Sequence, residues 1–372
     1  RAGTAPLLQS RKRTATEALD SVGTVLVTGG AGFIGSAVVR HLVRGTKYRV
    51  VNADSLTYAA TLESVAAVEE SDRYHFEHAD ITDLDRVQRI LESHRPTAVL
   101  HLAAETHVDR SIDDPTDFVQ TNVVGTFRLL EAVRAYLRAR PDARSSFRFC
   151  HVSTDEVFGA LAPTGAFEET TPYAPRSPYS ASKAAADHLV RAWYHTYDLP
   201  IIVTNCSNNY GPYQFPEKLI PHMIISALEG RSLPIYGDGE QVRDWLFVED
   251  HARALIQILE RGIVGDTYLV GGRSERTNLE VTQRICDVLD AQRPRSDSRS
   301  YKEQIAFVED RPGHDRRYAV ECGKLERELG WRAEVPFEEG IEMTVRWYLE
   351  NEFWWTSLRS ARYGGDRLGL GA

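Results

Sequence analysis

Short apolar runs alternate with amphipathic stretches over roughly the first half of the chain. Apolar runs lie at 24–28, 49–52, 74–78, 98–102, 147–153 and 201–205, and helical patterns lie near 83–94, 115–140 and 179–197. Runs of this length separated by helical periodicity predict parallel strands joined by crossover helices. The first half is therefore expected to form an α/β fold, a doubly wound parallel sheet with helices on both faces.

The pattern changes after residue 207. Glycine and proline interrupt it repeatedly, and only short helices are predicted, near 216–229 and 249–261. We expect residues 208–372 to form mainly a smaller, mixed α/β lobe that binds substrate through loops, while the chain is free to cross back between lobes. Residues 24–207 then form mainly the first domain, and residues 1–23 a flexible N-terminal extension.

Composition and charge narrow the possible functions. The formal net charge is −9 and the pI is near 5.8, which argues against nucleic acid or an anionic membrane surface as the main partner. No apolar run approaches the ~20 residues that a membrane span needs. The four cysteines are scattered without metal-ligand spacing, so neither a metal site nor a disulfide framework is predicted, and a cytoplasmic location is expected.

A glycine-rich turn follows the first apolar run. Gly29, Gly32 and Gly35 stand between a predicted strand and a predicted helix, where the backbone can approach a pyrophosphate at the helix N-terminus. Asp54 follows the second predicted strand, where its carboxylate can accept hydrogen bonds from the adenosine ribose hydroxyls. A carboxylate there repels a 2'-phosphate, so the turn and Asp54 together predict a Rossmann-like domain that binds NAD rather than NADP.

Two further strand ends belong to the same predicted site. Asp80 and Ile81 follow the third strand, where they can flank an adenine ring. Leu102, Ala103 and Ala104 close the fourth strand with small or apolar side chains, as expected where a cofactor crosses the carboxyl edge of a parallel sheet.

The acid and base chemistry is concentrated in two short segments. Tyr179 and Lys183 are four residues apart, which places both on one helical face, and we expect the ammonium to lower the pKa of the phenol toward working pH. Asp155 and Glu156 directly follow the fifth strand. Neighbouring carboxyl groups tend to split their pKa values, so one can act as an acid and the other as a base. Which of the two has the raised pKa is open from sequence alone.

Several motifs in order resemble the extended short-chain dehydrogenase/reductase family and, more narrowly, the dTDP-glucose 4,6-dehydratases. They span about 24–355 and leave out the N-terminal extension. Thr106, Phe158 and Ser55 stand where serine, tyrosine and lysine are common in that family. The matching segments are 28–35, 103–112, 153–159, Tyr179 with Lys183, 206–221, 243–245 and 310–315.

The resemblance implies a function and a set of binding residues. The implied reaction is NAD-dependent dehydration of dTDP-glucose to dTDP-4-keto-6-deoxyglucose: oxidation at C4, loss of water across C5 and C6, and hydride return to C6. Tyr179, Lys183, Thr154, Asp155 and Glu156 are implied to be catalytic, with Tyr179 as the base at the 4-hydroxyl, Glu156 at C5 and Asp155 as the acid at C6. Implied cofactor contacts are Gly29, Gly32, Phe33, Ile34, Gly35, Asp54, Ser55, Leu56, Thr57, Asp80, Ile81, Leu102, Ala103, Ala104, Thr121, Tyr179, Lys183 and Asn209. Implied substrate contacts are Thr106, Thr154, Asn208, Lys218, Leu219, Pro234, Ile235, Tyr236, Arg243, Asn278, Arg311 and His314.

Alternatives and the assembly stay open at this stage. An NAD-dependent sugar-nucleotide 4-epimerase shares the glycine turn and the Tyr179–Lys183 pair but has no need for Asp155 and Glu156. A catalytically silent NAD-binding sensor is expected to have lost these groups, and all are present. Family behaviour suggests a homodimer through helices near 115–138 and 179–197. The base of the nucleotide and the pathway are not determined by the residues alone.

Overall fold

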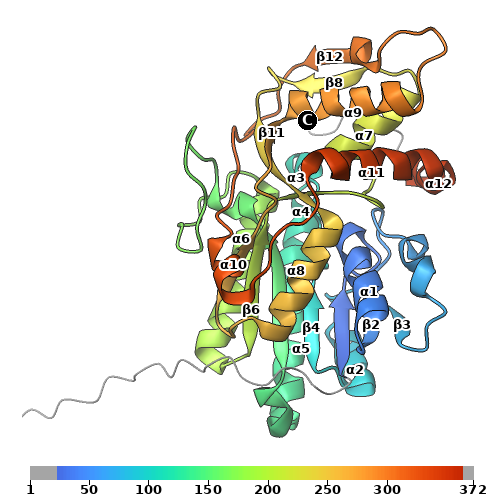
Figure 1. Cartoon of the computed structure of the whole chain (residues 1–372). Helices are drawn as coiled ribbons and strands as arrows, with labels where there is room; N and C mark the ends of the chain where they lie inside the picture. Colours follow the sequence, from blue (N-terminus) through green and yellow to red (C-terminus); the bar gives the residue numbers. More distant parts are fainter. Residues whose placement is uncertain (1–22, 363–372) are drawn as a thin grey trace, which may run out of the picture.

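The computed structural model describes residues 23–362. The predicted extension at 1–23 therefore lies, apart from Gly23, outside the described residues. Within them the chain forms two lobes stacked one above the other, with the large sheet in the lower one (Figure 1).

Seven parallel strands form the large sheet in the described part of the chain. Their order is β10-β6-β5-β4-β1-β2-β3, which confirms the predicted doubly wound α/β class. The strands are β1 (Thr24–Thr28), β2 (Arg49–Asp54), β3 (Tyr74–His78), β4 (Ala98–His101), β5 (Arg148–Thr154), β6 (Ile201–Cys206) and β10 (Thr267–Val270). The sequence pattern predicts the first six. It misses β10, because four residues between glycine-containing turns resemble the surrounding loops.

Helices cover both faces of this sheet. One face packs on α1 (Phe33–Gly45), α8 (Val248–Arg261) and α10 (Gly323–Leu329), and the other on α2 (Leu84–His94), α5 (Thr126–Ala139) and α6 (Pro178–Tyr197). Strand β1 shows the arrangement: Val25 and Val27 lie in the α1 cluster, whereas Leu26 lies in the α2 cluster. Alternate residues of a strand point to opposite faces, so an almost wholly apolar strand is expected in a sheet buried on both sides.

The predicted helix near 115–140 is not one regular helix. It begins as α4 (Thr116–Phe118), passes through a π-helical segment at Val119–Gly125 and continues as α5. The short helix α3 (Val108–Asp113) precedes it. π-helical segments often occur at functional sites, and Thr121 in this segment lines the pocket described below.

The second lobe combines small sheets with helices. Strand β9 pairs in parallel with β7 and antiparallel with β11, and β8 pairs with β12. The elements are β7 (Asn208–Tyr210), β8 (Leu233–Tyr236), β9 (Val242–Phe247), β11 (Glu275–Thr277), β12 (Ile305–Val308), α7 (Leu219–Leu228), α9 (Asn278–Gln292), α11 (Phe337–Glu350) and α12 (Glu352–Arg362). Their core includes the buried side chains of Tyr348, Trp354 and Trp355.

The chain crosses between the lobes more than once. After β9 it returns to the large sheet as α8 and β10, enters the second lobe again for α9, and comes back as α10. No helix among residues 23–362 is long and apolar enough to cross a bilayer.

Candidate active site

The glycine turn after β1 brings three backbone segments into close contact. Gly29 has a φ of +73°, and a Cβ there would lie 2.6 Å from the amide nitrogen of Ala103. A Cβ on Gly35 would lie 2.0 Å from the carbonyl oxygen of Gly29. Side chains are therefore excluded where the turn, the end of β4 and the first turn of α1 meet. No side chain in the described part caps α1 at Gly32, so the helix N-terminus presents backbone amides to the pocket.

Asp54 is fixed at the end of β2. One of its oxygens accepts a hydrogen bond from Ala31 N at 2.9 Å, and the other accepts from Leu56 N at 2.8 Å. Burial raises the pKa of Asp54, and the two backbone hydrogen bonds oppose that shift. Leu56 itself has a φ of +52° and lies outside the pocket lining, so it contributes its amide rather than its side chain.

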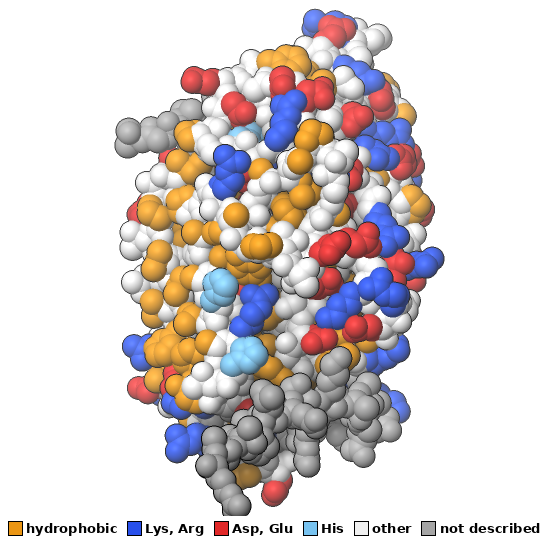
Figure 2. Space-filling model, turned by 90° about the vertical axis from the view of Figure 1, so that its left-hand side faces the viewer, with side chains coloured by type: hydrophobic (Ala, Val, Ile, Leu, Met, Phe, Trp, Pro, Cys, Tyr) orange, Lys and Arg blue, Asp and Glu red, His pale blue; other side chains and the backbone are white. Residues whose placement is uncertain are grey.

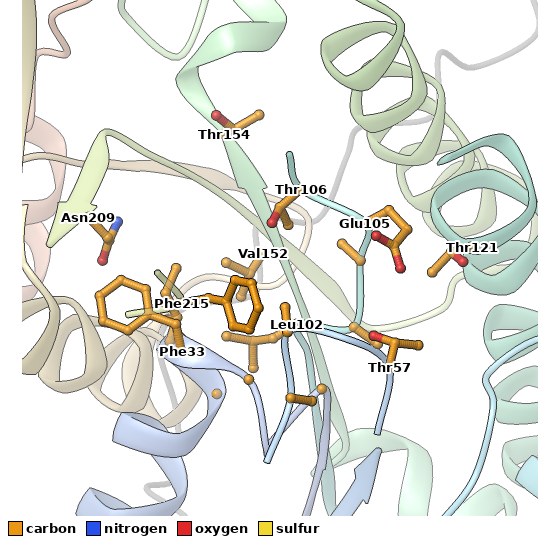
Figure 3. A pocket seen from close by; sticks show the side chains of 18 of the residues that line it. Phe33, Thr57, Leu102, Glu105, Thr106, Thr121, Val152, Thr154, Asn209 and Phe215 are labelled. Carbon is orange, nitrogen blue, oxygen red and sulfur yellow. The ribbon is translucent and has the colours of Figure 1, made fainter. Parts of the chain in front are cut away.

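One pocket runs along the carboxyl edge of the large sheet. Phe33 and Phe215 lie on one side of it, Leu102 and Val152 form its middle, and Glu105 and Thr121 lie across from Asn209 (Figure 3). Every predicted cofactor residue except Leu56 lines it: Gly29, Gly32, Phe33, Ile34, Gly35, Asp54, Ser55, Thr57, Asp80, Ile81, Leu102, Ala103, Ala104, Thr121, Tyr179, Lys183 and Asn209. We call it the cofactor pocket.

A second pocket opens toward the smaller lobe. It is lined by every predicted substrate residue except Thr154, which lines the cofactor pocket: Thr106, Asn208, Lys218, Leu219, Pro234, Ile235, Tyr236, Arg243, Asn278, Arg311 and His314. We call it the substrate pocket. The two pockets share the five residues Thr106, Glu156, Asn208, Glu217 and Lys218, so they meet beside a carboxyl group.

Tyr179 and Lys183 lie in the first turns of α6. The helix starts at Pro178, and its N-cap Ser177 forms a capping box with Ser180, which fixes where the two side chains emerge. Lys183 Nζ donates to the carbonyl oxygen of Val152 at 2.9 Å. Burial, followed by the charge of Glu156, holds the pKa of Tyr179 well above its ordinary value. The predicted net lowering of this pKa is therefore wrong for the side chains of this pocket, because burial of the phenol raises it.

Asp155 and Glu156 differ in their surroundings. Asp155 is 1% exposed, and its Oδ2 has no hydrogen-bond partner among the described residues. Burial, then Glu156 and Asp244, holds its pKa well above the usual range. Burial also raises the pKa of Glu156, but Arg311, Arg243 and Lys218 oppose that shift. Both pKa values are thus raised, that of Asp155 more strongly, and Asp155 lines neither of the two pockets whereas Glu156 lines both.

The basic groups of the substrate pocket are held by backbone and side-chain partners. Arg243 donates to the carbonyl oxygen of Asp315 at 3.0 Å, and its guanidinium lies 4.3 Å above the centre of the Tyr318 ring. Arg311 forms an ion pair with Asp109. Lys218 Nζ donates to the carbonyl oxygen of Thr106 at 2.9 Å. Three cations from three separate segments thus surround one cavity, an arrangement suited to a diphosphate.

Sequence reasoning missed a buried carboxylate at the junction of the pockets. Glu217 accepts from Tyr58 OH at 2.9 Å and from Arg110 Nε at 2.9 Å, and its side chain is fully buried. Nearby, the carboxylate of Asp109 accepts hydrogen bonds from Arg311 and from the hydroxyl of Tyr236. Glu217 and Asp109 both lie inside motifs that the sequence analysis names. A charged residue within each motif could therefore have indicated a functional position.

One cluster with metal-ligand chemistry lies elsewhere among the described residues. His75, Glu77 and His94 group at the outer edge of the sheet, with ligand atoms within 4.8 Å of one another. Glu77 also pairs with Arg86 at 2.5 Å, and none of the three clustered residues lines either pocket. The cluster is therefore separate from the chemistry described above.

The cofactor pocket fits a dinucleotide. Its floor is glycine backbone that leaves no room for a Cβ. The amides at the N-terminus of α1 can bind a pyrophosphate, and the carboxylate of Asp54 can bind a ribose. Four buried polar atoms of residues that line it have no hydrogen-bond partner within the described residues: Ser153 Oγ, Ser207 Oγ, Asn208 Oδ1 and Gln214 Oε1. Buried polar atoms are usually satisfied, so these atoms are available to a bound molecule.

The chain is similar to known proteins over most of its length. The profile of the family described as GDP-mannose 4,6 dehydratase matches residues 26–344. A dTDP-glucose 4,6-dehydratase of Neisseria meningitidis serogroup B is 58% identical over 351 residues, which cover 93% of this chain and 99% of the relative.

Two solved structures are similar over most of their length. A Bacillus anthracis dTDP-glucose 4,6-dehydratase, solved in complex with NAD, has a TM-score of 0.80 and 43% identity, and the match covers 90% of this chain and 99% of that one. A dTDP-glucose 4,6-dehydratase from Streptomyces venezuelae, solved with NAD and TYD bound, has a TM-score of 0.82 and 44% identity, with the same coverage of 90% and 99%.

Proposed function

The chain belongs to the dTDP-glucose 4,6-dehydratase family, and from this premise we propose that it converts dTDP-glucose into dTDP-4-keto-6-deoxyglucose with NAD as cofactor. The enzyme is a hydro-lyase. The observation that carries the proposal is the meeting of the two pockets at Glu156, since a sugar placed there lies beside this carboxyl group and next to the cofactor pocket that Tyr179 lines.

The proposed roles are those that the resemblance implies, and Tyr179, Lys183 and Glu156 all line the cofactor pocket. Bound NAD accepts a hydride from C4 of the sugar and returns it to C6. Tyr179 takes the proton of the 4-hydroxyl, which Thr154 orients, and Lys183 binds the nicotinamide ribose beside it. A ketone at C4 acidifies the C5 proton, which Glu156 removes as the base, and a proton returns to C5 when the hydride is delivered to C6.

The departing C6 hydroxyl needs a proton of its own. We assign this step to Asp155, because burial holds the pKa of this carboxyl group well above its usual range. Burial raises the pKa of Glu156 as well, but three nearby cations oppose that shift and favour its ionised form. The acid and the base are therefore distinguished by burial and by neighbouring charge, although they are adjacent in the sequence.

The substrate's nucleotide half lies in the second pocket in this proposal. Arg243, Arg311 and Lys218 meet the diphosphate, and Pro234, Ile235 and Tyr236 form a wall against the base. Leu219, Asn278 and His314 complete that pocket, with Thr106 and Asn208 near the sugar. Residues 24–207 then serve mainly the cofactor and residues 208–372 mainly the sugar nucleotide.

The reaction can be tested with isotopically labelled substrate. Incubation with dTDP-glucose is expected to give a 4-keto-6-deoxy product, read by its absorbance in alkali, and deuterium at C4 is expected to reappear at C6 of the same sugar. Formation of the galactose epimer alone would instead identify an epimerase. Label lost to solvent, or retained at C4, would also contradict the proposal.

We further propose that the enzyme is a homodimer joined through α5 and α6. On the side of the molecule where Figure 1 draws α6, Figure 2 shows hydrophobic side chains gathered over one half of the surface. Val119 is 48% exposed and Tyr197 is 38% exposed, and the small residues Ala181 and Ala192 of α6 are exposed, which favours close approach of helices. Light scattering at micromolar concentration should give twice the chain mass, and Ala192→Arg should give a monomer. A monomeric wild type would refute the dimer.

A cytoplasmic location is the last part of the proposal. The four cysteines, Cys150, Cys206, Cys286 and Cys322, are free and buried. Unpaired thiols are typical of proteins in a reducing compartment.

A further inference from the structure

Lys183 is a buried cation on the wall of the cofactor pocket. It is 4% exposed and donates to the carbonyl oxygen of Val152. Removing an ammonium group from water is costly unless an opposite charge lies near it, and burial accordingly lowers the pKa of Lys183. The lysine therefore needs a partner charge that the proposed reaction does not supply.

Asp187 lies one helical turn further along the same face of α6. It is 0% exposed, yet its carboxylate is well supported. Oδ2 accepts from Tyr173 OH at 2.6 Å and from Asn205 Nδ2 at 3.1 Å, and Oδ1 lies 3.1 Å from His151 Nε2. Burial acts to raise the pKa of Asp187, but His151, Lys183 and Tyr173 together hold it below its ordinary value. Donors on two separate segments thus hold the carboxylate one helical turn from Lys183, and no direct ion pair joins the two side chains in the described part of the chain.

The other titratable groups around Lys183 carry little charge near neutral pH. Burial lowers the pKa of His101 on β4 and of His151 on β5, and raises that of Cys206 on β6 to about 12. Tyr179 on α6 has a pKa well above its ordinary value. On the far side of Asp187, Arg191 donates to Tyr173 OH at 2.8 Å.

We propose that Asp187 is a positioning residue that acts as the buried counter-ion of Lys183, keeping the ammonium charged and directed into the cofactor pocket. This inference deepens the proposed function and rests on it. Asp187 touches neither pocket, so its effect on the reaction passes through the lysine.

The pH profile of kcat tests this role directly. Without the carboxylate the buried ammonium loses its proton at lower pH, so Asp187→Asn should move the alkaline arm of the profile down by about one unit, a roughly tenfold loss on that arm that is recovered at lower pH. Asp250→Asn is the matched control, because Asp250 is also 0% exposed and accepts from two backbone amides far from Lys183.

The outcomes separate this inference from the proposed function. Turnover of dTDP-glucose by the wild type tests the function, whereas the shift between variants tests Asp187. A uniform fall in kcat with an unmoved profile, or an equal shift in the Asp250→Asn control, would overturn the counter-ion role.

A second set of variants covers the case in which Asp187→Asn fails to fold. In a Lys183→Met background there is no buried cation to leave unpaired, so Asp187→Asn should cost several degrees less in Tm than it does in the wild type. Asp250→Asn should cost the same in both backgrounds. A double variant no more stable than Asp187→Asn alone would contradict the inference.

Discussion

The cofactor pocket is shaped mainly by backbone, whereas the substrate pocket is shaped mainly by charged side chains. The first rests on backbone: a glycine turn, strand ends and a helix N-terminus whose positions follow from a few consecutive residues. The second rests on long charged side chains such as Arg243 and Arg311, which reach one cavity from separate segments and are held by distant partners. A single change in the backbone of the cofactor pocket should therefore abolish most of its affinity for NAD. Each side chain removed from the substrate pocket should lower the affinity for the sugar nucleotide by a smaller step.

The largest effect on kcat is expected from a substitution at Tyr179, beside the point where the two pockets meet. Tyr179→Phe removes the group proposed to take the 4-hydroxyl proton, and general acid–base catalysis contributes about 10²–10⁴-fold. We expect kcat to fall by about 10³-fold while bound NAD and Tm stay near their wild-type values. Stopped-flow or discontinuous product assays measure the loss. A variant within tenfold of the wild type would remove Tyr179 from the mechanism.

The next effect tests the backbone pocket. Gly35→Ala puts a Cβ 2.0 Å from the carbonyl oxygen of Gly29, so the turn must shift and NAD affinity should fall by about 100-fold, about 2.7 kcal/mol. Gly45→Ala is the control in the same helix, because a Cβ there meets nothing within 4 Å. Calorimetric titration with NAD compares the two. Equal affinities would show that the pocket tolerates the added methyl group.

A smaller and more selective effect should mark the side-chain pocket. Arg311→Gln removes one of the charged contacts proposed for the diphosphate, worth about 1.5–3 kcal/mol, so KM for dTDP-glucose should rise about 10–100-fold with NAD affinity unchanged. The control is Arg316→Gln, whose side chain is exposed and pairs with Asp238 at the surface, where ion pairs contribute little. Loss of NAD binding in Arg311→Gln would mean that the two pockets are not independent.

The smallest effect concerns the thermal stability of the protein and its dependence on Asp155. The pKa of Asp155 is raised in the folded state, so the folded protein holds this proton more tightly than the unfolded chain does. The wild type accordingly loses stability as pH rises from the ordinary range of an aspartate toward the raised value. Asp155→Asn lacks this loss, so its Tm should exceed that of the wild type by a few degrees at pH 8, with the difference vanishing near pH 4. Calorimetric scans across that range would reject the assignment if the difference were constant.

The sequence predicted the cofactor half better than the rest, and the reason is locality. Strand, glycine turn and helix are consecutive, so spacing alone predicts where Gly29, Gly35 and Asp54 lie. The substrate residues were available only through resemblance, because nothing in a local pattern indicates that Lys218 and Arg311 share a cavity. Their roles stay predictions until they are measured.

Two misses have a common physical cause. The pKa of Tyr179 was predicted from one neighbour, Lys183, whereas the buried surroundings decide its direction. The carboxylates Glu217 and Asp187 have partners more than ten residues away in the chain, such as Tyr58 and His151. Burial and long-range pairing are properties of the folded chain, and local spacing does not contain them.

The return of the chain to the large sheet as β10 limits where this enzyme can be divided into separate fragments. Cutting after residue 207 would discard the edge strand and two covering helices, leaving β6 with unpaired backbone groups. Swapping the sugar-nucleotide half between relatives would thus require several coordinated crossovers rather than one. Evolution is expected to have changed specificity here mostly by point substitution within the loops, not by trading whole modules.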